Sequence, residues 1–408
     1  MTPPLPEPVR EPAGGRLSPA IAPSLLREMN QRLLLDRLFS AGPATRPQLA
    51  RDAGLSQPTV IAALGDLERA GLVVATVAGT QQQGRPAKSY AADARAGTVA
   101  GIDIGRGWLH LRIADLAGTV LAQLDVRNTA KGAGALVELT ARSLAEVTAT
   151  AGLSTADVTH TAIGSPGVLD PRRGGVRYAA NLPGWHQAGL AQALIERIGP
   201  SVSVDNDANL AALAELSQGA ARGLTDFAYL TVGTGVGVGL VLDGRIYRGV
   251  TGAAGEVGYL PIGDLPAGPR RRARGMFEEV VAADAVVRYA KDAGLSGRLT
   301  AEGVFRQARA GQPEALAAVA RQARQLALAV ASIAAVLDPQ LIVLGGRIGQ
   351  NLDLLEPTIL ATLREVTPMR PTLAPGQLGA EAVVCGAVVR GTTLAREAVF
   401  TERLTAAG

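Results

Sequence analysis

The 408-residue sequence has one cysteine and three histidines, and aromatic residues make up only 3% of the chain. A single thiol, Cys385, excludes an internal disulfide framework and is typical of a reducing compartment. The longest apolar run, residues 326–337, is shorter than the roughly 18–20 residues that cross a membrane. The opening residues, MTPPLPEPVREPAGG, lack the apolar segment of a secretion signal. We therefore expect a soluble, cytoplasmic protein without a membrane partner.

The bulk composition is that of an ordinary globular protein, with 47% hydrophobic and 19% charged residues. A chain of this length is too long for one compact core and indicates two or three domains. The formal net charge is only +4, but residues 1–95 carry eleven Arg and Lys against eight Asp and Glu. This surplus favours a head that faces nucleic acid, and a solvated surface would explain it about as well.

The first hundred residues divide into a leader and a helical segment. Residues 1–20 are predicted to be disordered, because their prolines and glycines offer no apolar face to bury. Residues 21–92 have the pattern of a small DNA-binding domain. The leucines of its first predicted helix recur at helical spacing: Leu25, Leu33, Leu34, Leu35 and Leu38.

The stretch RPQLARDAGLSQPTVIAALGDLERAGLV, residues 46–73, predicts two more helices. Gly54 suits the tight turn between them, and Ser56 can cap the second of the two. Strands are predicted at 72–77 and 87–91, joined by a polar loop. Three helices followed by such a two-stranded wing predict a winged helix-turn-helix domain.

The last of these helices would lie in a major groove, where Gln pairs with adenine and Thr or Ala contacts a thymine methyl. Arg85, in the wing loop, is placed to enter a narrow minor groove. The candidate DNA-binding residues are Arg46, Ser56, Gln57, Thr59, Arg85 and Lys88. A helical hairpin used for dimerisation, and a solvated turn in place of a functional wing, are the alternatives.

A linker at 93–97 precedes a larger α/β region that repeats its own order of elements. Strands are predicted at 98–104, 109–115 and 120–126 before a long helix, and again at 227–232, 237–242 and 245–247. The repetition predicts two lobes with a ligand cleft between them. Lobe 1 comprises 98–211, completed by a C-terminal helix at 383–408, and lobe 2 comprises 212–382.

The stretch LTVGTGVGVGLVLDG, residues 230–244, places five glycines between β-branched apolar residues. Glycine weakens a buried strand, so this density indicates that a ligand approaches the backbone closely. Backbone N–H groups in such a loop can bind phosphate oxygens. A phosphate or a sugar-sized molecule is the expected ligand.

Several separate motifs, in a fixed order, resemble the ROK family (repressors, open reading frames and kinases) and its repressor branch. They are 101–105 GIDIG, 164–170 GSPGVLD, 181–185 NLPGW, 205–209 DNDAN, 231–237 TVGTGVG, 252–258 GAAGEVG and 342–346 IVLGG. The resemblance covers nearly the whole chain and implies an actin-like, hexokinase-like ATPase fold. It also implies a homodimer.

The resemblance assigns roles to individual residues. Asp207 matches the base that takes a proton from a sugar hydroxyl in kinases of the family. The sugar-binding candidates are Gly167, Asn206, Asp207, Glu256, Tyr259 and Glu278. The nucleotide- or phosphate-binding candidates are Asp103, Gly105, Thr234, Gly235, Gly237, Gly345 and Gly346. The alternatives are a helix cap for Asn206 and Asp207, and surface charge for Glu256 and Glu278.

The sequence also departs from the family pattern. Arg106 follows the first phosphate loop where a glycine is usual, which counts against phosphoryl transfer. The family's structural zinc site is missing, because Tyr259 replaces its histidine and residues 269–276 contain no cysteine. No metal is therefore expected. The arginine-rich run 270–274 is expected to form an exposed loop, with a role in binding DNA or an anion as the alternative. His110, His160 and His186 are interpreted as structural.

The third predicted helix carries Ile61 and Ala62 where repressors of the family often have polar residues, so direct base readout is expected to be modest. The favoured function is a sugar-responsive repressor that binds operator DNA and requires no cofactor. The alternative is a sugar kinase that uses ATP and Mg²⁺ and carries a regulatory head. A third possibility is a DNA-binding protein whose sugar pocket is inactive.

Overall fold

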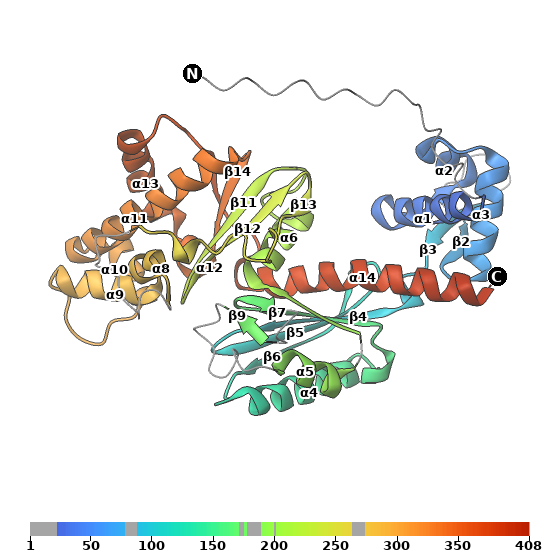
Figure 1. Cartoon of the computed structure of the whole chain (residues 1–408), viewed down its shortest axis with the longest axis horizontal. Helices are drawn as coiled ribbons and strands as arrows, with labels where there is room; N and C mark the ends of the chain where they lie inside the picture. Colours follow the sequence, from blue (N-terminus) through green and yellow to red (C-terminus); the bar gives the residue numbers. More distant parts are fainter. Residues whose placement is uncertain are drawn as a thin grey trace, which may run out of the picture. The chain divides into compact units, whose positions relative to one another are not determined.

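The computed structural model describes residues 23–77, 88–170, 175–177, 189–199, 201–262 and 274–407 (Figure 1). These residues form two compact units: unit 1 extends to Asp93 and includes residues from Glu402 onward, and unit 2 is Ala94–Thr401. The predictions for the leader 1–20, for Arg85, for 181–185 with His186, and for residues 270–273 of the arginine-rich run concern residues outside this description.

Unit 1 has the three helices and the small sheet expected of a winged helix-turn-helix module. The helices are α1 (Pro23–Ala41), α2 (Arg46–Ala53) and α3 (Gln57–Arg69), and the strands are β1 (Ala44–Thr45), β2 (Val73–Val77) and β3 (Lys88–Ala92). The strands pair antiparallel in the order β1-β3-β2. The core of the unit consists of Leu34, Leu35, Leu38, Leu49, Val60, Leu64, Leu67 and Tyr90.

The turn between α2 and α3 follows from its sequence. Gly54 has φ 65°, a left-handed conformation that ends α2 and favours glycine. Ser56 then caps α3, its hydroxyl accepting a hydrogen bond of 3.3 Å from the Thr59 N–H. These local signals place both helix ends where the sequence predicted them.

The inward face of α1 matches the predicted one in part, because Leu34, Leu35 and Leu38 are buried. Leu25 and Leu33 are 49% and 45% exposed. The buried face instead includes Gln31, which donates a hydrogen bond of 2.6 Å to the buried carboxylate of Asp66 on α3. Because each residue advances about 100° around a helix, Leu33 points away from a face that contains Gln31. Leucine spacing cannot reveal this polar contact with Asp66.

Unit 2 contains two five-stranded sheets of the same topology, one in each lobe. The sheet of lobe 1 has the order β10-β7-β4-β5-β6 and the sheet of lobe 2 has β13-β12-β11-β14-β15. The strands of lobe 1 are β4 (Thr98–Ile104), β5 (Trp108–Asp115), β6 (Val120–Arg127), β7 (His160–Ser165) and β10 (Val202–Asn206). Those of lobe 2 are β11 (Phe227–Val232), β12 (Val236–Leu242), β13 (Arg245–Ile246), β14 (Leu341–Gly345) and β15 (Leu373–Pro375).

In each sheet a meander of three antiparallel strands continues into parallel strands on one side. The repeated order of elements in the sequence therefore does correspond to a duplicated two-lobed fold. Lobe 1 also has a separate hairpin of β8 (Val168–Asp170) and β9 (Gly175–Arg177).

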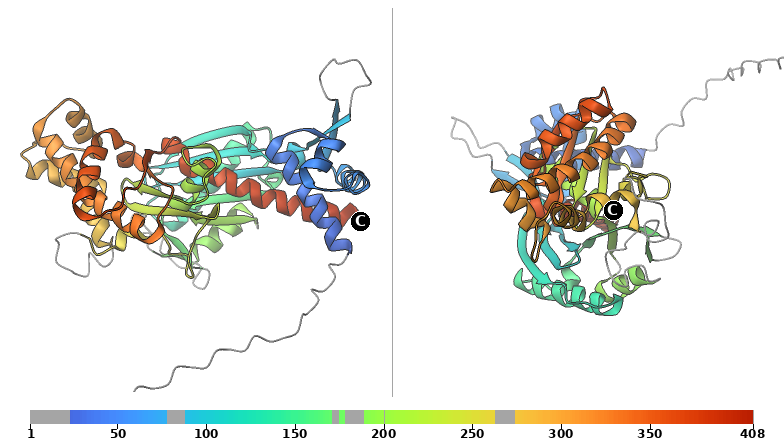
Figure 2. Two further views of the ribbon diagram at one scale, coloured as in Figure 1. Left: turned by 90° about the horizontal axis from the view of Figure 1, so that it is seen from above. Right: turned by 90° about the vertical axis from the view of Figure 1, so that its left-hand side faces the viewer.

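Helices cover both faces of the lobe 1 sheet. Helices α4 (Ala133–Thr150) and α5 (Leu190–Ile198) lie together on one face (Figures 1 and 2). Helix α14 (Ala382–Ala407) crosses the other, where Gly101 lets the strand approach: a Cβ there would lie 2.7 Å from Val388 Cγ2. Among the described residues, no helix has the length and apolarity needed to cross a membrane.

Lobe 2 has its larger core on one face of its sheet, under α8 (Met276–Val281), α9 (Ala283–Asp292), α10 (Ala301–Arg309), α11 (Pro313–Leu337) and α13 (Leu352–Val366). Helix α6 (Asp207–Gln218) packs on the opposite face. The chain enters α6 directly from β10 of lobe 1, so the start of this helix lies where the two lobes meet.

Candidate functional site

A cavity of about 260 Å³ is lined by residues of both lobes. Lobe 1 contributes the ends of β4 and β7 and the start of α6, and lobe 2 contributes the β11–β12 loop, the turn before Tyr259 and the start of α8. The cavity brings together eleven of the residues predicted from sequence: Asp103, Gly105, Gly167, Asn206, Asp207, Thr234, Gly235, Gly237, Glu256, Tyr259 and Glu278. Residues predicted from separate motifs therefore form one site.

Asn206 and Asp207 reach the cavity because β10 ends there and α6 begins. The Asn206 amide oxygen caps the helix, accepting a hydrogen bond of 3.2 Å from the Asn209 N–H. Its amide nitrogen donates to the Gly167 carbonyl oxygen at 3.2 Å. Asp207 Oδ1 accepts from the Ala208 N–H at 2.8 Å. The sequence left a helix cap and a place in the binding site as alternatives for Asn206. In the structure Asn206 both caps α6 and lines the cavity.

Three carboxyl groups of the cavity have raised pKa values. Burial, reinforced by the charge of Glu278 and opposed by backbone hydrogen bonds, raises the pKa of Asp207 to about 6. Burial and the charges of Asp207 and Glu278 raise that of Glu256 to about 7. Burial and the charge of Asp207 raise that of Asp103 to about 8. Near neutral pH this group holds protonated and ionised carboxyls together, and can both donate and accept hydrogen bonds.

Three of the five glycines in the stretch 230–244 line the cavity: Gly233, Gly235 and Gly237. The other two have different roles. A Cβ at Gly239 would overlap the Ala208 carbonyl, so this glycine allows β12 to pack on α6. Gly244, with φ 71°, belongs to the turn between β12 and β13. The prediction that these glycines let a ligand approach the backbone can therefore concern only the three that line the cavity.

The turn that carries Glu256 is pressed against β12. Gly255 has φ 91°, its carbonyl oxygen accepts a hydrogen bond of 2.9 Å from the Val238 N–H, and a Cβ at this position would overlap the Val238 carbonyl. Glycine is therefore needed there. The turn leaves Glu256 and Tyr259 on the cavity wall. Glu278 is 7% exposed and also lines the cavity, so the alternative that it is a surface charge is wrong.

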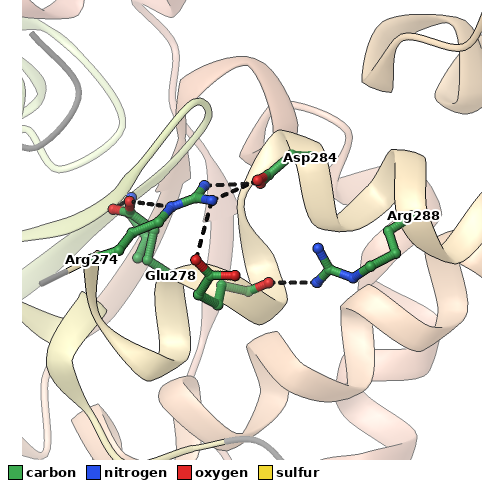
Figure 3. Close-up of polar contacts among 6 residues, drawn as sticks. Arg274, Glu278, Asp284 and Arg288 are labelled. Atoms are coloured by element: carbon green, nitrogen blue, oxygen red, sulfur yellow. Dashed lines mark hydrogen bonds and ion pairs between the residues drawn. The ribbon is translucent and has the colours of Figure 1, made fainter. Parts of the chain in front are cut away.

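Arg274 also lines the cavity, and sequence reasoning missed it. Its guanidinium pairs with Glu278, Glu279 and Asp284, and only 20% of its side chain is exposed (Figure 3). The prediction of an exposed loop is therefore wrong for this arginine. The available signal was the acidic segment that follows it, with carboxylates at positions 278, 279 and 284 that a nearby arginine can pair with.

Comparison with known proteins identifies the larger unit. The ROK family description matches residues 99–389, which is most of the chain. The chain belongs to the ROK family. A glucokinase of Halalkalibacterium halodurans is 33% identical over 62% of this chain and 82% of its own length. A xylose repressor of Caldicellulosiruptor bescii is 25% identical over 86% of this chain and 90% of its own.

Among solved structures, a ROK family transcriptional regulator, described as a homologue of the Escherichia coli MLC protein, superposes with a TM-score of 0.77. The match covers 93% of this chain and 99% of the regulator at 23% sequence identity. At this identity it establishes the fold alone. The expected actin-like, hexokinase-like fold preceded by a head is confirmed.

A second cavity of about 620 Å³ in the ROK domain is lined by Gly346, one of the two remaining phosphate-binding candidates. It is lined by Asp103, Gly105, Arg106, Trp108, His110, Arg127, Thr234, Gly346 and Arg347, among others. The Arg127 guanidinium lies 4.8 Å from the Trp108 ring centroid. Gly345 adjoins this wall as the N-cap of α12 (Gly346–Gly349), and a Cβ there would overlap the Tyr229 hydroxyl.

The histidines within the described chain have local partners. His110 Nδ1 lies 2.9 Å from Asp125 Oδ1, and the ring stacks on Trp108. Both ring nitrogens of His160 contact serine hydroxyls, those of Ser201 and Ser203. In the described part of the chain, no group of three or more His, Cys, Asp or Glu is arranged to hold a metal ion.

In the unit that precedes the ROK domain, the residues predicted to bind DNA have different surroundings. Gln57 is exposed, whereas the hydroxyls of Ser56 and Thr59 are 2.8 Å apart and serve the helix cap. The Arg46 guanidinium and the Lys88 ammonium both lie over Tyr90, 5.2 and 5.0 Å from its ring centroid. Two predicted cations, from α2 and β3, thus gather on one aromatic ring.

Ile61, one helical turn beyond Gln57 on α3, is 46% exposed. Sequence reasoning treated it as a weakness in base readout and not as a contact residue. The exposed residues of α3 are Gln57, Pro58, Ile61, Ala62 and Arg69.

Proposed function

We propose that this ROK protein is a sugar-responsive transcriptional repressor of carbohydrate metabolism. Unit 1 binds operator DNA, and the 260 Å³ cavity binds the sugar. One observation carries the proposal: the chain that contains the carboxyl-lined cavity also contains three helices and a small sheet, as expected of a helix-turn-helix module, with an exposed Gln57. The similarity to a xylose repressor supports it, because that alignment is longer than the ROK region alone.

The chemistry of the cavity suits a sugar. Asp207, Glu256 and Glu278 are carboxyls that can each accept hydrogen bonds from neighbouring hydroxyls, and Asn206 adds an amide. Tyr259 supplies an aromatic ring and a hydroxyl at the same wall. With a volume of about 260 Å³, the cavity is close to the lower end of the range for ligand pockets, roughly 300–1,000 Å³, which favours a monosaccharide.

The sugar would act by shifting a conformational equilibrium. Because its contacts come from both lobes, it binds the closed arrangement of the ROK domain more tightly than an open one. In a homodimer, closure would change the spacing between two DNA-binding heads. That spacing decides whether both half-sites of a palindromic operator can be bound.

The test combines calorimetry with DNA binding. D-Xylose, D-glucose and N-acetyl-D-glucosamine are titrated into the full-length protein, and fluorescence anisotropy then measures binding to DNA from upstream of its own coding region. We expect at least one sugar to change DNA affinity tenfold or more, with binding that weakens steeply as salt increases. Equal DNA affinity in the presence and absence of every sugar would overturn the proposal.

An ATP-dependent sugar kinase is the second candidate, favoured by Asp207. This carboxyl lies beside the glycine loop with a pKa of about 6, which suits a general base near neutral pH. In this function Asp207 would take the proton of the attacking sugar hydroxyl. Bound ATP and Mg²⁺ would supply the transferable phosphoryl group, held by Thr234, Gly235 and Gly346.

Against this function, Arg106 is exposed, follows the first phosphate loop and lines both cavities. A coupled assay for ADP decides between the two candidates. The repressor predicts no sugar-dependent ADP formation. Turnover by the wild-type protein that Asp207→Asn abolishes would establish the kinase.

A further inference from the structure

The glycine loop 233–236 forms one wall of the 260 Å³ cavity, and two helices hold it from behind. The Gly233 carbonyl oxygen accepts a hydrogen bond of 2.8 Å from the backbone N–H of Ala283, the first residue of α9. The Val236 N–H donates to Glu278 Oε2 on α8 at 3.2 Å. The position of the loop therefore depends on how α8 and α9 are held relative to each other.

Arg274 connects these two helices. Its Nε donates to Glu278 Oε1 at 3.1 Å, and its Nη1 and Nη2 donate to the two carboxylate oxygens of Asp284 at 2.6 and 2.9 Å (Figure 3). Asp284 lies in the first turn of α9. A planar guanidinium can bind one carboxylate with two N–H groups and a second carboxylate with a third, which a lysine ammonium cannot reproduce.

The backbone after Arg274 reaches the other wall of the cavity. Gly275 has φ 102°, and a Cβ there would overlap the Gly258 carbonyl, so this segment lies directly against the turn that carries Glu256 and Tyr259. Arg274 is therefore linked to the glycine loop through Glu278, and to the turn that carries Glu256 and Tyr259 through its neighbour Gly275. Its side chain is 20% exposed and that of Glu278 is 10% exposed, so water competes little for their contact.

We propose that Arg274 is a positioning residue: it fixes Glu278 and, through Glu278 and α9, the glycine loop, so that the cavity is formed before ligand arrives. The zinc site implied by the ROK resemblance has no thiolate or imidazole ligand in residues 269–276. Arg274 belongs to this stretch, and its guanidinium places a positive charge beside Glu278 and Glu279.

Hydrogen exchange of the ligand-free full-length protein tests the proposal without any sugar. We expect backbone amides of residues 231–238 to exchange about tenfold faster in Arg274→Ala, and at an intermediate rate in Arg274→Lys. Arg309→Gln is the control, because Arg309 pairs with Asp353, contacts neither α8 nor α9 through this pair, and does not line the cavity. Unchanged exchange in both Arg274 variants, or equal acceleration in the control, would overturn the proposal.

A second measurement rests on the proposed function. By calorimetry with D-glucose and D-xylose, Arg274→Ala should weaken the affinity for the sugar that binds by about tenfold, while Arg309→Gln retains the wild-type value. If neither sugar binds the wild-type protein, the proposed function fails for these sugars while the exchange experiment still decides the role of Arg274. If Arg274→Ala does not fold, Arg274→Lys is used in both the exchange and the calorimetry experiments. Wild-type exchange and wild-type affinity in Arg274→Lys would then contradict a positioning role for Arg274.

Discussion

Arg248 of lobe 2 donates two hydrogen bonds, of 3.2 and 2.8 Å, to one carboxylate oxygen of Asp205 in lobe 1. The other oxygen of Asp205 accepts from Arg390 Nε on α14 at 3.2 Å. Asp205 directly precedes Asn206 at the cavity, and the Arg248 carbonyl accepts from the Ala254 N–H in the turn that carries Glu256. This carboxylate therefore joins both lobes and α14 next to the cavity.

Asp205→Asn should lower the free energy of unfolding by about 1–3 kcal/mol. The Asp205 side chain is only 12% exposed, and the substitution leaves two guanidinium groups without their carboxylate. Urea unfolding measures the change. Arg309→Gln is the control, because its pair with Asp353 is exposed on both sides and should contribute less than about 0.5 kcal/mol. Equal losses in the two variants would contradict a special role for Asp205.

Sugar affinity should decrease as the pH falls from 8 to 5.5. An ionised carboxylate accepts more hydrogen bonds from hydroxyls than a protonated one. Since the pKa of Glu256 is about 7 and that of Asp207 about 6, both lose their charge within this range. Calorimetric titration at a series of pH values should show the decrease beginning near pH 7.

In Glu256→Gln the part of this decrease near pH 7 should disappear, and affinity at pH 8 should fall about tenfold, which corresponds to about 1.4 kcal/mol. Glu302→Gln is the control, since Glu302 forms an exposed pair with Arg347 outside the cavity. A wild-type profile that does not change with pH would refute the assignment of these carboxyls to the ligand.

Asp103→Asn should stabilise the protein at high pH. Burial and the charge of Asp207 raise the pKa of Asp103 from 3.8 to about 8. The folded state thus retains a proton that the unfolded state releases above pH 4. The stability linked to this group is present in full below pH 3.8 and is lost as the pH rises through about 8. Asparagine cannot ionise and avoids this loss.

Thermal unfolding at pH 5 and pH 8 measures the difference. The stability of Asp103→Asn relative to wild type should increase by at least about 1 kcal/mol between these pH values. Glu302→Gln, which removes an exposed carboxylate, should show no such increase. A constant difference between wild type and Asp103→Asn would mean that Asp103 is ionised in the folded state throughout.

Local signals allowed the helix-turn-helix and the separate motifs of the cavity to be predicted. Gly54, Ser56 and Pro58 set the ends of α2 and α3 through backbone conformation and capping, which depend on neighbours in sequence. The repeated order of strands was enough to predict the two lobes. Motifs such as GSPGVLD and DNDAN could be recognised separately, whereas only the fold places Gly167 and Asn206 within hydrogen-bond distance.

Features that depend on contacts between distant elements could not be predicted in the same way. The hydrogen bond between Gln31 on α1 and Asp66 on α3 joins residues thirty-five positions apart. The glycine at position 239 is required by α6, and a run of glycines does not distinguish packing from ligand binding. Arg274 can pair with both Glu278 and Asp284 only because α8 and α9 begin close together in space. Composition does not reveal that proximity.

The last prediction separates two kinds of DNA contact. Lys88 is exposed, lies over Tyr90 next to Arg46, and has one carboxylate partner, Glu68, at 3.2 Å among the described residues. A lysine in this setting suits a phosphate. Lys88→Gln should weaken binding to all DNA sequences alike and reduce the slope of log affinity against log salt by about 1.

Gln57 and Ile61 lie one turn apart on the exposed surface of α3, where an amide can pair with adenine and a branched side chain can contact a thymine methyl. Gln57→Ala and Ile61→Ala should each reduce discrimination at one base pair by about 1–3 kcal/mol and leave the salt slope unchanged. Anisotropy titrations with operator variants at several salt concentrations measure both quantities. If Lys88→Gln altered base preference, or if the α3 variants changed only the salt slope, α3 would not be the element that reads the operator.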